Sequence, residues 1–476
     1  RYVNAIFGQI TSYASVTSTT PAPPTINNVV VDPPEGIALD TRFNISVFAT
    51  DIFEATPLYY SFEYFNEALK KFVALRSFSF LNSMTSVLPT FGSQLKVRCK
   101  IQNSWGAEAS TQFSIPIVSI ASEAQQLNQV QSILLNELDS MNKTDDGESI
   151  INIVAATLSN INITSVQSDQ IMYIYSDIVE FVLNSTMQLI ETTDGDMSEY
   201  YVLSRVNTMG VISASKDLLS PSTADQILTV LDLAIEGCLH SDVSLNSEGT
   251  FDVANSISNV FSGQTDNLGN KTLETISRLV NLLARDKMVS ENETRISAEA
   301  FEMNVRVDTR TTLSNTQISN SLGSVLIPNI SSLNELDIYT VQSVSFNENS
   351  NPYTTSQNSA NISSPIVIFK ILNMNTKVKL ENLTNPIEIV LKRNNASDIP
   401  IDYNYECRYY DETSNNTWLT DGCWLAYYDN DSIVCRCNHT TSFTSMIIYD
   451  PKKPNKASDG LYIAWIIMNS IYAVLA

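Results

Sequence analysis

The feature that most constrains this chain is a cluster of four cysteines near its C-terminal end. Cys407, Cys423, Cys435 and Cys437 lie close together, whereas the other two of the six cysteines stand alone. Two long gaps and a single-residue gap do not match the paired Cys-x-x-Cys spacing of zinc ribbons. We therefore predict two disulfide bonds formed in an oxidising compartment, with zinc binding as the alternative. The spacing by itself leaves the pairing of the four cysteines open.

The charge balance limits the possible partners and chemistry. The formal net charge is −23 and no basic stretch could neutralise phosphates, so we exclude nucleic-acid binding. Because the chain has only two histidines, His240 and His439, we expect no metal site and no cofactor. The acidic runs 145–148 and 429–431 do not match an EF-hand loop, and we interpret them as surface turns.

Neutral polar residues take the place of charges in this sequence. Only 17% of the residues are charged, and Asn, Ser and Thr are abundant, which is typical of a secreted or cell-surface glycoprotein. Thirteen N-x-S/T sequons are candidate glycosylation sites. They begin at Asn44, Asn142, Asn162, Asn184, Asn270, Asn292, Asn329, Asn361, Asn382, Asn395, Asn415, Asn430 and Asn438.

The two ends of the chain indicate a fragment of a membrane protein. The chain begins at Arg1 without a methionine or a secretory apolar segment, as expected of an internal or processed piece. Residues 461–476 are apolar and uncharged, and we predict that they begin a first transmembrane helix after a linker at 451–460. A GPI signal that uses the small residues 457–460 is the alternative.

Residues 25–118 contain short alternating segments separated by turn residues. These segments are 26–31, 42–49, 58–64 and 95–101. They predict an Ig- or fibronectin-like β-sandwich, in which Cys99 is a buried free thiol. Residues 1–16 are similar to the final hairpin of such a sandwich, and the Pro- and Thr-rich residues 17–24 predict a linker.

The pattern becomes helical from 121 to 287 and returns to strands from 288 to 450. Ser122 begins a capping-box pattern, and apolar stripes follow at helical spacing. The stripes include Leu127, Val130, Leu134 and Leu138; Ile171, Ile174, Ile178 and Phe181; Ile227, Val230, Leu231 and Cys238; and Leu273, Ile276, Val280 and Leu283. We interpret them as helix-on-helix core, which makes Cys238 a core residue and His240 a helix-end cap. Helices followed by strands predict an α+β multidomain fold.

The cysteine cluster contains one further constellation of residues. A Trp418 and a Gly422-Cys423 pair precede the sequence Cys435-Arg-Cys437-Asn438-His439-Thr440-Thr441. This arrangement closely resembles the GPS motif (407–449), the proteolysis site of adhesion receptors and polycystin-1-like proteins. The helical and strand blocks before and around it resemble the two subdomains of the GAIN domain, A at 121–287 and B at 288–450.

The resemblance implies both a disulfide pairing and a reaction. The family pairs Cys407 with Cys435 and Cys423 with Cys437. Its cleavage would fall between Thr440 and Thr441: the Thr441 hydroxyl attacks the Thr440 carbonyl, His439 takes the proton, and the two pieces stay associated. The substrate is then the chain itself, and we expect no turnover of an external substrate.

One position departs from the family pattern. The residue between His439 and Thr441 is usually leucine in the family and is Thr440 here, which also completes a sequon at Asn438. A glycan on Asn438 would crowd the site and could block cleavage. The alternative to self-cleavage is therefore an uncleaved GPS that acts as a disulfide-stapled fold.

The segment after the cleavage site has a possible role of its own. In related adhesion receptors it acts as a tethered agonist, with Thr441, Phe443, Met446 and Ile447 at the matching positions. The simpler interpretation is that this segment is the last buried strand of the domain. The two interpretations are compatible, because a strand buried in the domain stays hidden until the extracellular part detaches.

A sandwich before a helical GAIN block resembles the REJ region of polycystin-1-like proteins. That resemblance implies a cell-surface and often ciliary protein that associates with a polycystin-2-type channel and binds extracellular protein or glycan ligands. An adhesion G-protein-coupled receptor is the second possibility. A structural adhesion protein that uses an uncleaved GAIN module is the third.

Overall fold

The computed structural model describes most of the chain, in two compact units. The described residues are 2–7, 10–15, 22–53, 55–67, 70–89, 92–120, 122–141, 146–158, 169–192, 199–216, 219–263, 265–347, 350–353, 362–373, 376–393, 403–411 and 417–449. The units are Arg1–Thr186 and Met187–Ala476. The expected linker at 451–460, the apolar segment 461–476 and most of the expected linker at 17–24 lie outside the described residues. Within the described part, no helix is long and apolar enough to cross a membrane.

The first unit contains a β-sandwich followed by helices. Its strands are β1 (Tyr2–Phe7), β2 (Ile10–Ser15), β3 (Thr25–Asp32), β4 (Gly36–Ile37), β5 (Phe43–Thr50), β6 (Tyr59–Asn66), β7 (Lys71–Ser79), β8 (Ser83–Ser86), β9 (Gln94–Gln102) and β10 (Glu108–Val118). Its helices are α1 (Glu123–Met141), α2 (Asp146–Leu158) and α3 (Asp169–Thr192), and the division between the units falls within α3.

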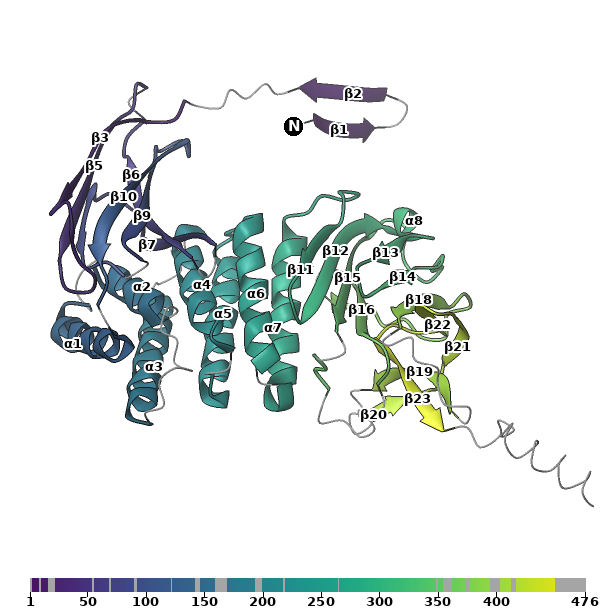
Figure 1. Ribbon diagram of the computed structural model, residues 1–476. Helices are drawn as coiled ribbons and strands as arrows, with labels where there is room; N and C mark the ends of the chain where they lie inside the picture. The colour runs from purple at the N-terminus through teal and green to yellow at the C-terminus, as the bar shows by residue number, and fades with distance from the viewer. Residues whose placement is uncertain are drawn as a thin grey trace, which may run out of the picture. The chain divides into compact units, whose positions relative to one another are not determined.

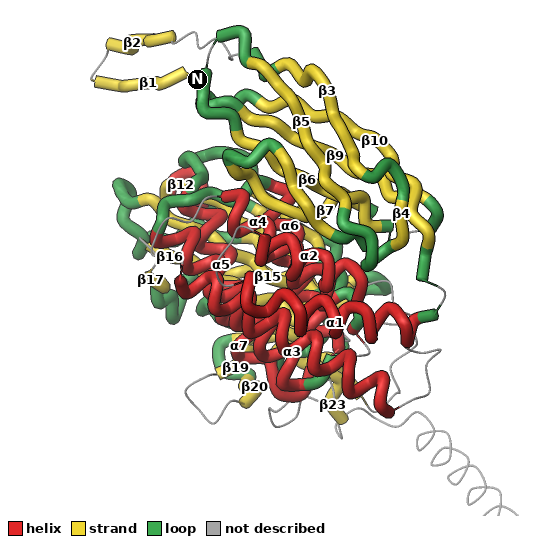
Figure 2. The backbone as a smooth tube through the Cα atoms, turned by 90° about the vertical axis from the view of Figure 1, so that its left-hand side faces the viewer, coloured by secondary structure: helices red, strands yellow, loops and turns green. Residues whose placement is uncertain are grey.

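Alternation of apolar and polar side chains builds this sandwich. One sheet has the order β3-β5-β8 and the other β4-β10-β9-β6-β7, and Figure 2 shows both in yellow. In β9, Leu95, Val97, Cys99 and Ile101 are buried while the residues between them are not. Burial raises the pKa of the free Cys99 thiol to about 12, so this cysteine is an inert core residue. Strands β1 and β2 form a separate hairpin.

The second unit begins with four long helices. They are α4 (Glu199–Ser213), α5 (Pro221–His240), α6 (Ser247–Gly263) and α7 (Thr265–Arg285). Ser220 caps α5 by accepting a hydrogen bond from the Thr223 amide, and Cys238 is fully buried near the other end of this helix. The Nδ1 atom of His240 lies 2.9 Å from the Glu236 carbonyl oxygen, a position suited to capping the helix end.

Two sheets follow the helices in the second unit. The strands are β11 (Thr294–Ser297), β12 (Phe301–Thr309), β13 (Gln317–Ser319), β14 (Gly323–Leu326), β15 (Ile338–Phe346), β16 (Ile366–Asn373), β17 (Thr376–Lys377), β18 (Ile387–Lys392), β19 (Tyr403–Asp411), β20 (Thr417–Leu419), β21 (Cys423–Tyr428), β22 (Ser432–Cys437) and β23 (Ser442–Tyr449), with the short helix α8 (Arg310–Leu313) between β12 and β13.

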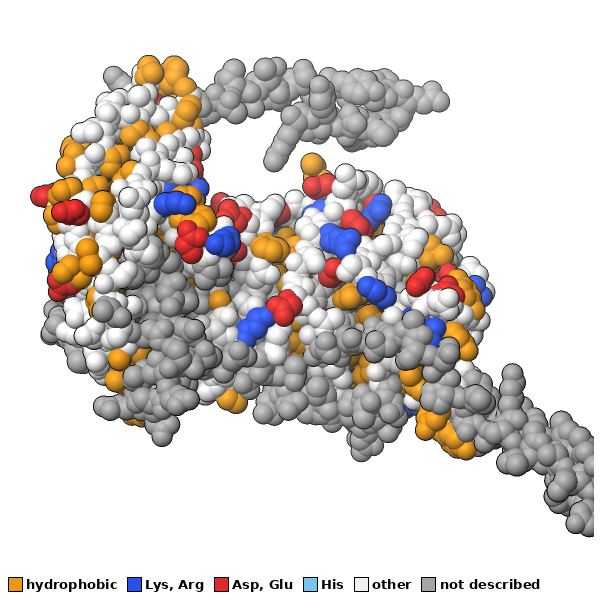
Figure 3. Space-filling model, in the orientation of Figure 1, with side chains coloured by type: hydrophobic (Ala, Val, Ile, Leu, Met, Phe, Trp, Pro, Cys, Tyr) orange, Lys and Arg blue, Asp and Glu red, His pale blue; other side chains and the backbone are white. Residues whose placement is uncertain are grey.

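The two sheets enclose one hydrophobic core. The first sheet runs β11-β12-β15-β16-β23-β19-β20, with β17 beside β16, and the second runs β13-β14-β18-β22-β21. Inward-facing side chains such as Phe369, Ile389 and Phe443 fill the space between them. On the outer face of the first sheet, α7 contacts β12 and α6 contacts β11, as Figure 1 shows. Charged groups are scattered among white neutral atoms on the face in Figure 3, as the composition predicts.

Candidate functional site

The residues of the GPS-like motif lie at the start of the last strand. β23 lies between β16 and β19 in the first sheet. It pairs with β19 along its whole length, from Tyr410↔Ser442 to Tyr403↔Tyr449, but with β16 only at its beginning. The expected cleavage peptide, Thr440–Thr441, therefore lies in the short turn between β22 and this central strand.

Two disulfide bonds hold that turn. Cys407 on β19 is bonded to Cys435 on β22, which ties the two sheets together across the core. Cys423 on β21 is bonded to Cys437 directly opposite on β22, with a Cα–Cα distance of 4.2 Å. This is the pairing that the family resemblance implies. Because Cys437 immediately precedes Asn438, both bonds restrain the chain just before the expected cleavage site.

Backbone hydrogen bonds fix three of the four residues of the turn. The Asn438 amide donates to the Gly422 carbonyl at 2.9 Å, and the Asn438 carbonyl accepts from the Leu383 amide at 2.9 Å. The Thr440 amide donates to the Leu380 carbonyl at 3.3 Å, and the Thr441 carbonyl accepts from the Phe369 amide at 3.0 Å. The cleavage peptide is thus held between three separate segments of the chain.

Gly422 allows the close approach of these segments. Its φ is +78°, and a Cβ atom there would collide with Oδ1 of Asn438 and crowd Nδ1 of His439. We predict that Gly422→Ala displaces His439 and slows self-cleavage about a hundredfold, measured as the appearance of the small fragment over time. Gly106→Ala is the matched control, because Gly106 has φ +81° with open space around it. Equal cleavage in both variants would contradict this account.

His439 is half-buried beside aromatic rings. Its ring meets that of Tyr409 edge-on with 4.3 Å between centroids. Its Nδ1 lies 3.1 Å from Oδ1 of Asn438, and its Nε2 lies 4.0 Å from the Cys423 sulfur. Burial lowers the pKa of His439 below its ordinary value, and the negative charge of Glu381 opposes this change only in part. The imidazole is therefore neutral at physiological pH, as a general base must be.

The lowered pKa of His439 predicts a pH profile for cleavage. Since only the neutral imidazole accepts a proton, the rate should rise with pH through this lowered pKa and stay level above the ordinary value of about 6.5. The measurement is the cleavage rate of freshly folded chain between about pH 5 and pH 8. A rate still rising between pH 7 and pH 8 would mean that another group is the base.

The nucleophile and its neighbour have different environments. The Thr441 hydroxyl donates to the Tyr410 carbonyl at 2.9 Å, and within the described residues no hydrogen bond joins Thr441 to His439. The Thr441 hydroxyl must therefore leave the Tyr410 carbonyl before it can pass its proton to His439. The Thr440 hydroxyl is buried and has no hydrogen-bond partner in the described part of the chain. An apolar residue would fit this position better, which gives a physical reason for the leucine usual in the family.

Water can reach the cleavage peptide. A cavity of about 440 Å³ is lined by all four residues from Asn438 to Thr441, together with Tyr409, Tyr410 and Gly422. Tyr409 and Tyr410 belong to the Cys407-Arg-Tyr-Tyr-Asp segment, but nothing in their spacing reveals that they flank the site. Their place follows from the register of β19 against β23.

The expected tethered segment is buried in the sheet. Phe443 and Met446 are each 1% exposed, and Ile447 packs against the core from a partly buried position. Hydroxyl groups hold the opposite edge of the strand, where the β16 ladder ends. Oγ of Ser364 accepts from the Ser445 amide at 2.9 Å, and the Ser363 hydroxyl donates to the Ser445 carbonyl at 3.1 Å.

The sequons divide into three groups. Seven asparagines are exposed: Asn44, Asn184, Asn270, Asn292, Asn329, Asn382 and Asn430. Asn438 is half-buried at the candidate site. Five lie outside the described residues: Asn142, Asn162, Asn361, Asn395 and Asn415. In the acidic run 429–431, the Asp429 carboxylate accepts bonds from the Asp431 and Ser432 amides, which makes this run a self-satisfied turn.

Comparisons with known proteins identify two domains in this chain. The family profile of the REJ domain matches residues 3–156, and that of GAIN subdomain B matches residues 282–451. No curated protein gives a match. Among solved structures, the full extracellular region of zebrafish Gpr126/Adgrg6 aligns with 18% identity and a TM-score of 0.39, over 51% of this chain and 34% of that one. The chain thus spans about a third of the length of that structure.

Proposed function

Because this chain joins a REJ domain to a GAIN subdomain B, and both are extracellular regions of membrane receptors, we propose that it is the extracellular stalk of a polycystin-1-like membrane protein. In this proposal, the segment 461–476 begins the membrane anchor and the GPS motif cleaves itself between Thr440 and Thr441. The fragments remain associated through β23. The stalk serves adhesion or mechanosensing and the regulation of a polycystin-2-type channel, at the cell surface or in the ciliary membrane.

The reaction that we propose is an N→O acyl shift followed by hydrolysis. The Thr441 oxygen forms a bond to the Thr440 carbonyl carbon while His439 accepts the hydroxyl proton. The C–N bond then breaks, and His439 returns the proton to the departing nitrogen, which becomes the amino group of Thr441. Water hydrolyses the resulting ester and releases the Thr440 carboxylate and the Thr441 hydroxyl.

One observation carries this proposal more than any other. A threonine peptide lies in a turn restrained by two disulfides, beside a neutral histidine, in a cavity that water can enter. Denaturing electrophoresis of the purified chain, followed by N-terminal sequencing of the small fragment, tests it. We expect a fragment that begins at Thr441. A single full-length band from correctly disulfide-bonded chain would refute self-cleavage.

A specific observation also favours the uncleaved alternative. The Thr441 hydroxyl is engaged by the Tyr410 carbonyl rather than by His439, and Asn438 is a sequon. In this alternative, the GPS is a disulfide-stapled β-domain of a structural adhesion protein, and force reaches the membrane through an unbroken chain. The same electrophoresis separates the two functions.

The sequon predicts that Thr440 controls how much of the chain is cleaved. Thr440→Val removes both the glycosylation site at Asn438 and a buried hydroxyl that has no partner among the residues that the structure describes. We expect a larger cleaved fraction and a stability gain of about 1 to 3 kcal/mol, measured by electrophoresis and urea unfolding of secreted chain. Thr440→Ser keeps the sequon and serves as the control. A glycan-bearing Asn438 in the cleaved fraction, found by mass spectrometry, would contradict glycan control.

A further inference from the structure

The amide side chain of Asn438 lies against the ring of the candidate base. Its Oδ1 atom is 3.1 Å from Nδ1 of His439, the next residue along the chain. An amide oxygen only accepts hydrogen bonds, so Nδ1 is the ring nitrogen that carries the proton of the neutral imidazole. The lone pair of the ring is then on Nε2. The Asn438 side chain therefore determines which nitrogen of His439 can receive a proton.

Gly422 makes room for this contact. A Cβ atom at position 422 would lie 2.3 Å from Oδ1 of Asn438 and 3.2 Å from Nδ1 of His439, which would push both atoms away. The Gly422 carbonyl also accepts from the Asn438 amide at 2.9 Å, which fixes the backbone from which this side chain extends. The disulfide between Cys423 and Cys437 joins the residues next to Gly422 and Asn438. The glycine, the hydrogen bond and the disulfide together hold the amide oxygen against the ring.

The other nitrogen of the ring faces no proton donor. Its neighbour is the Cys423 sulfur at 4.0 Å, and this sulfur belongs to a disulfide and carries no proton. Among the residues that the structure describes, no other hydrogen-bonding group contacts Nε2. His439 also lines the cavity that water can enter. The Nε2 lone pair is therefore left to accept the Thr441 proton.

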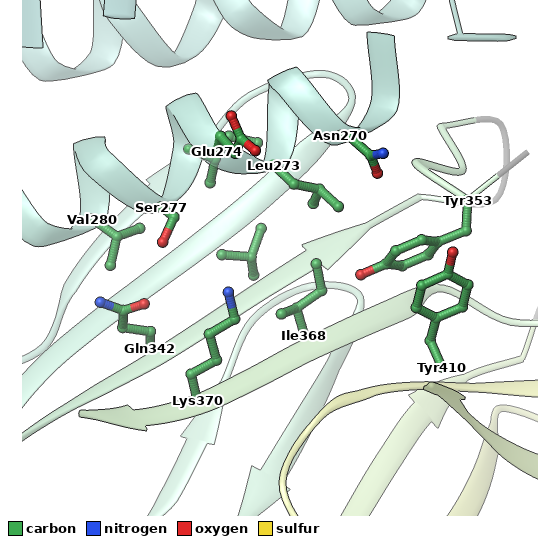
Figure 4. A pocket seen from close by; sticks show the side chains of 12 residues that line it. Asn270, Leu273, Glu274, Ser277, Val280, Gln342, Tyr353, Ile368, Lys370 and Tyr410 are labelled. Carbon is green, nitrogen blue, oxygen red and sulfur yellow. The ribbon is translucent and has the colours of Figure 1, made fainter. Parts of the chain in front are cut away.

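The base must compete for that proton with the Tyr410 carbonyl, to which the Thr441 hydroxyl donates. The carbonyl is held in place, because the Tyr410 ring stacks on Tyr353 with 3.9 Å between centroids (Figure 4). The Tyr353 hydroxyl in turn lies 2.8 Å from the Ser442 hydroxyl, at the first residue of β23. Since this acceptor is fixed, the Thr441 hydroxyl has to move toward His439. It gains a hydrogen bond there only if Nε2 carries no proton.

We propose that Asn438 is a positioning residue for self-cleavage: its amide oxygen keeps the ring proton of His439 on Nδ1 and leaves Nε2 to accept the Thr441 proton. Asn438 transfers no proton itself and acts only through the ring. Neutral imidazole in water prefers the opposite tautomer, which would present a donor to a hydroxyl whose proton must leave. The tautomer stands by itself, whereas its effect on the rate rests on the proposed self-cleavage.

Nuclear magnetic resonance of the imidazole reads the tautomer directly, whether or not the chain cleaves. Because the chain has only two histidines, isotope labelling of histidine gives the ring signals of His240 and His439 alone. Every chain carries Thr440→Val, which removes the sequon at Asn438, and Thr441→Val, which removes the nucleophile. At about pH 8, where the His439 ring is neutral, we expect its proton on Nδ1. A proton on Nε2 would overturn the proposal.

Two substitutions separate an acceptor at position 438 from a side chain that only fills space. Asn438→Ala removes the oxygen, so the ring proton of His439 should move largely to Nε2. Asn438→Asp keeps an acceptor in the same place, so the proton should stay on Nδ1. The matched controls are Asn430→Ala and Asn430→Asp, because Asn430 is exposed between β21 and β22 and does not line the cavity of His439. An unchanged tautomer in Asn438→Ala would overturn the proposal.

The rate of cleavage tests the consequence, in chains that carry Thr440→Val and keep Thr441. Asn438→Ala should cleave about five- to tenfold more slowly, the factor that corresponds to one net hydrogen bond. Asn438→Asp should keep most of the rate at high pH, but its rise with pH should shift upward by about one unit, because a carboxylate beside Nδ1 raises the pKa of His439. The other charged residues that line the cavity are the same in both variants: Lys377, Lys379, Glu381, Asp411 and Asp421.

A purely structural role for Asn438 predicts a different result. It would slow the alanine and aspartate variants alike and shift neither pH profile. Formation of both disulfides shows that each variant has folded. Asn438→Ala that cleaves as fast as its parent chain would overturn the role in cleavage.

The two measurements distinguish failure of this proposal from failure of self-cleavage. If no chain cleaves but Asn438→Ala moves the ring proton, the tautomer assignment stands and self-cleavage is refuted. If the chains cleave but Asn438→Ala changes neither the ring proton nor the rate, the positioning role is refuted and self-cleavage stands.

Discussion

Replacing Thr441 by valine leaves the chain uncut, so that denaturing electrophoresis gives one band where the natural chain gives two. Valine has the shape of threonine but carries no hydroxyl, and without that oxygen the Thr440 carbonyl has no nucleophile within the chain. Thr441→Ser keeps the hydroxyl and should cleave. His439→Gln removes the base and should slow cleavage by about 10² to 10⁴. Mass spectrometry of the C-terminal piece defines the cut.

The control for this experiment is that the Thr441→Val variant folds as the natural chain does. Thr441→Val also loses the hydrogen bond to the Tyr410 carbonyl, worth about 1 kcal/mol. Both disulfides should still form, and the urea midpoint should change little, because Thr441 is only partly buried. If the valine variant still yields a fragment beginning at residue 441, a protease in the host cell makes the cut and the chain does not.

Phe443→Ala has the second large effect, on the retention of the cleaved strand. Phe443 is 1% exposed, belongs to the core between the two sheets and lies opposite Tyr409 on β19. Truncating a buried phenylalanine costs about 3 to 5 kcal/mol, since it removes apolar contact and leaves a cavity. The small fragment should therefore dissociate roughly 10²- to 4 × 10³-fold more readily. Size-exclusion chromatography of cleaved chain in mild urea measures the dissociation.

A position on the same strand provides the contrast. Tyr449 is 60% exposed at the far end of β23, so Tyr449→Ala should change retention by less than about threefold. Phe443→Leu should lie between the two, because it keeps most of the apolar volume. Equal retention in the alanine variants of Phe443 and Tyr449 would mean that the core does not hold the strand. The retained fragment would then depend on backbone pairing alone.

Local pattern was a good guide to the elements of this fold. The alternation of Leu95, Val97, Cys99 and Ile101 predicts β9, and the burial of those side chains agrees with it. The capping-box pattern at Ser122 marks the start of α1, where the Gln125 amide donates to the Ser122 hydroxyl at 3.3 Å. Both signals are contained within a few neighbouring residues, where side-chain period and backbone geometry are directly related. The boundary between the two units, which falls within α3, has no such local signal in the sequence, because it depends on which surfaces pack together.

The candidate site was only partly predictable. Spacing and family resemblance identified His439 and Thr441, but not the contacts that decide whether they react. The Tyr410 carbonyl that holds the Thr441 hydroxyl is 31 residues away along the chain. The Tyr353 hydroxyl that meets Ser442 is 89 residues away. Sheet order and register bring these groups together, and neither leaves a periodic mark in the sequence.

The sequence by itself determined the chemistry that is available: four clustered cysteines, a histidine two residues before a threonine, and a buried strand after them. The tertiary structure decided how that chemistry is held. It closed two disulfides around the turn, turned the Thr441 hydroxyl toward Tyr410 rather than His439, and left room beside Gly422 for the Asn438 amide oxygen. The physical reason is distance along the chain. Hydrophobic periodicity reflects residues that are close in the sequence, whereas the site is formed by strands that are far apart in the sequence and meet only after folding.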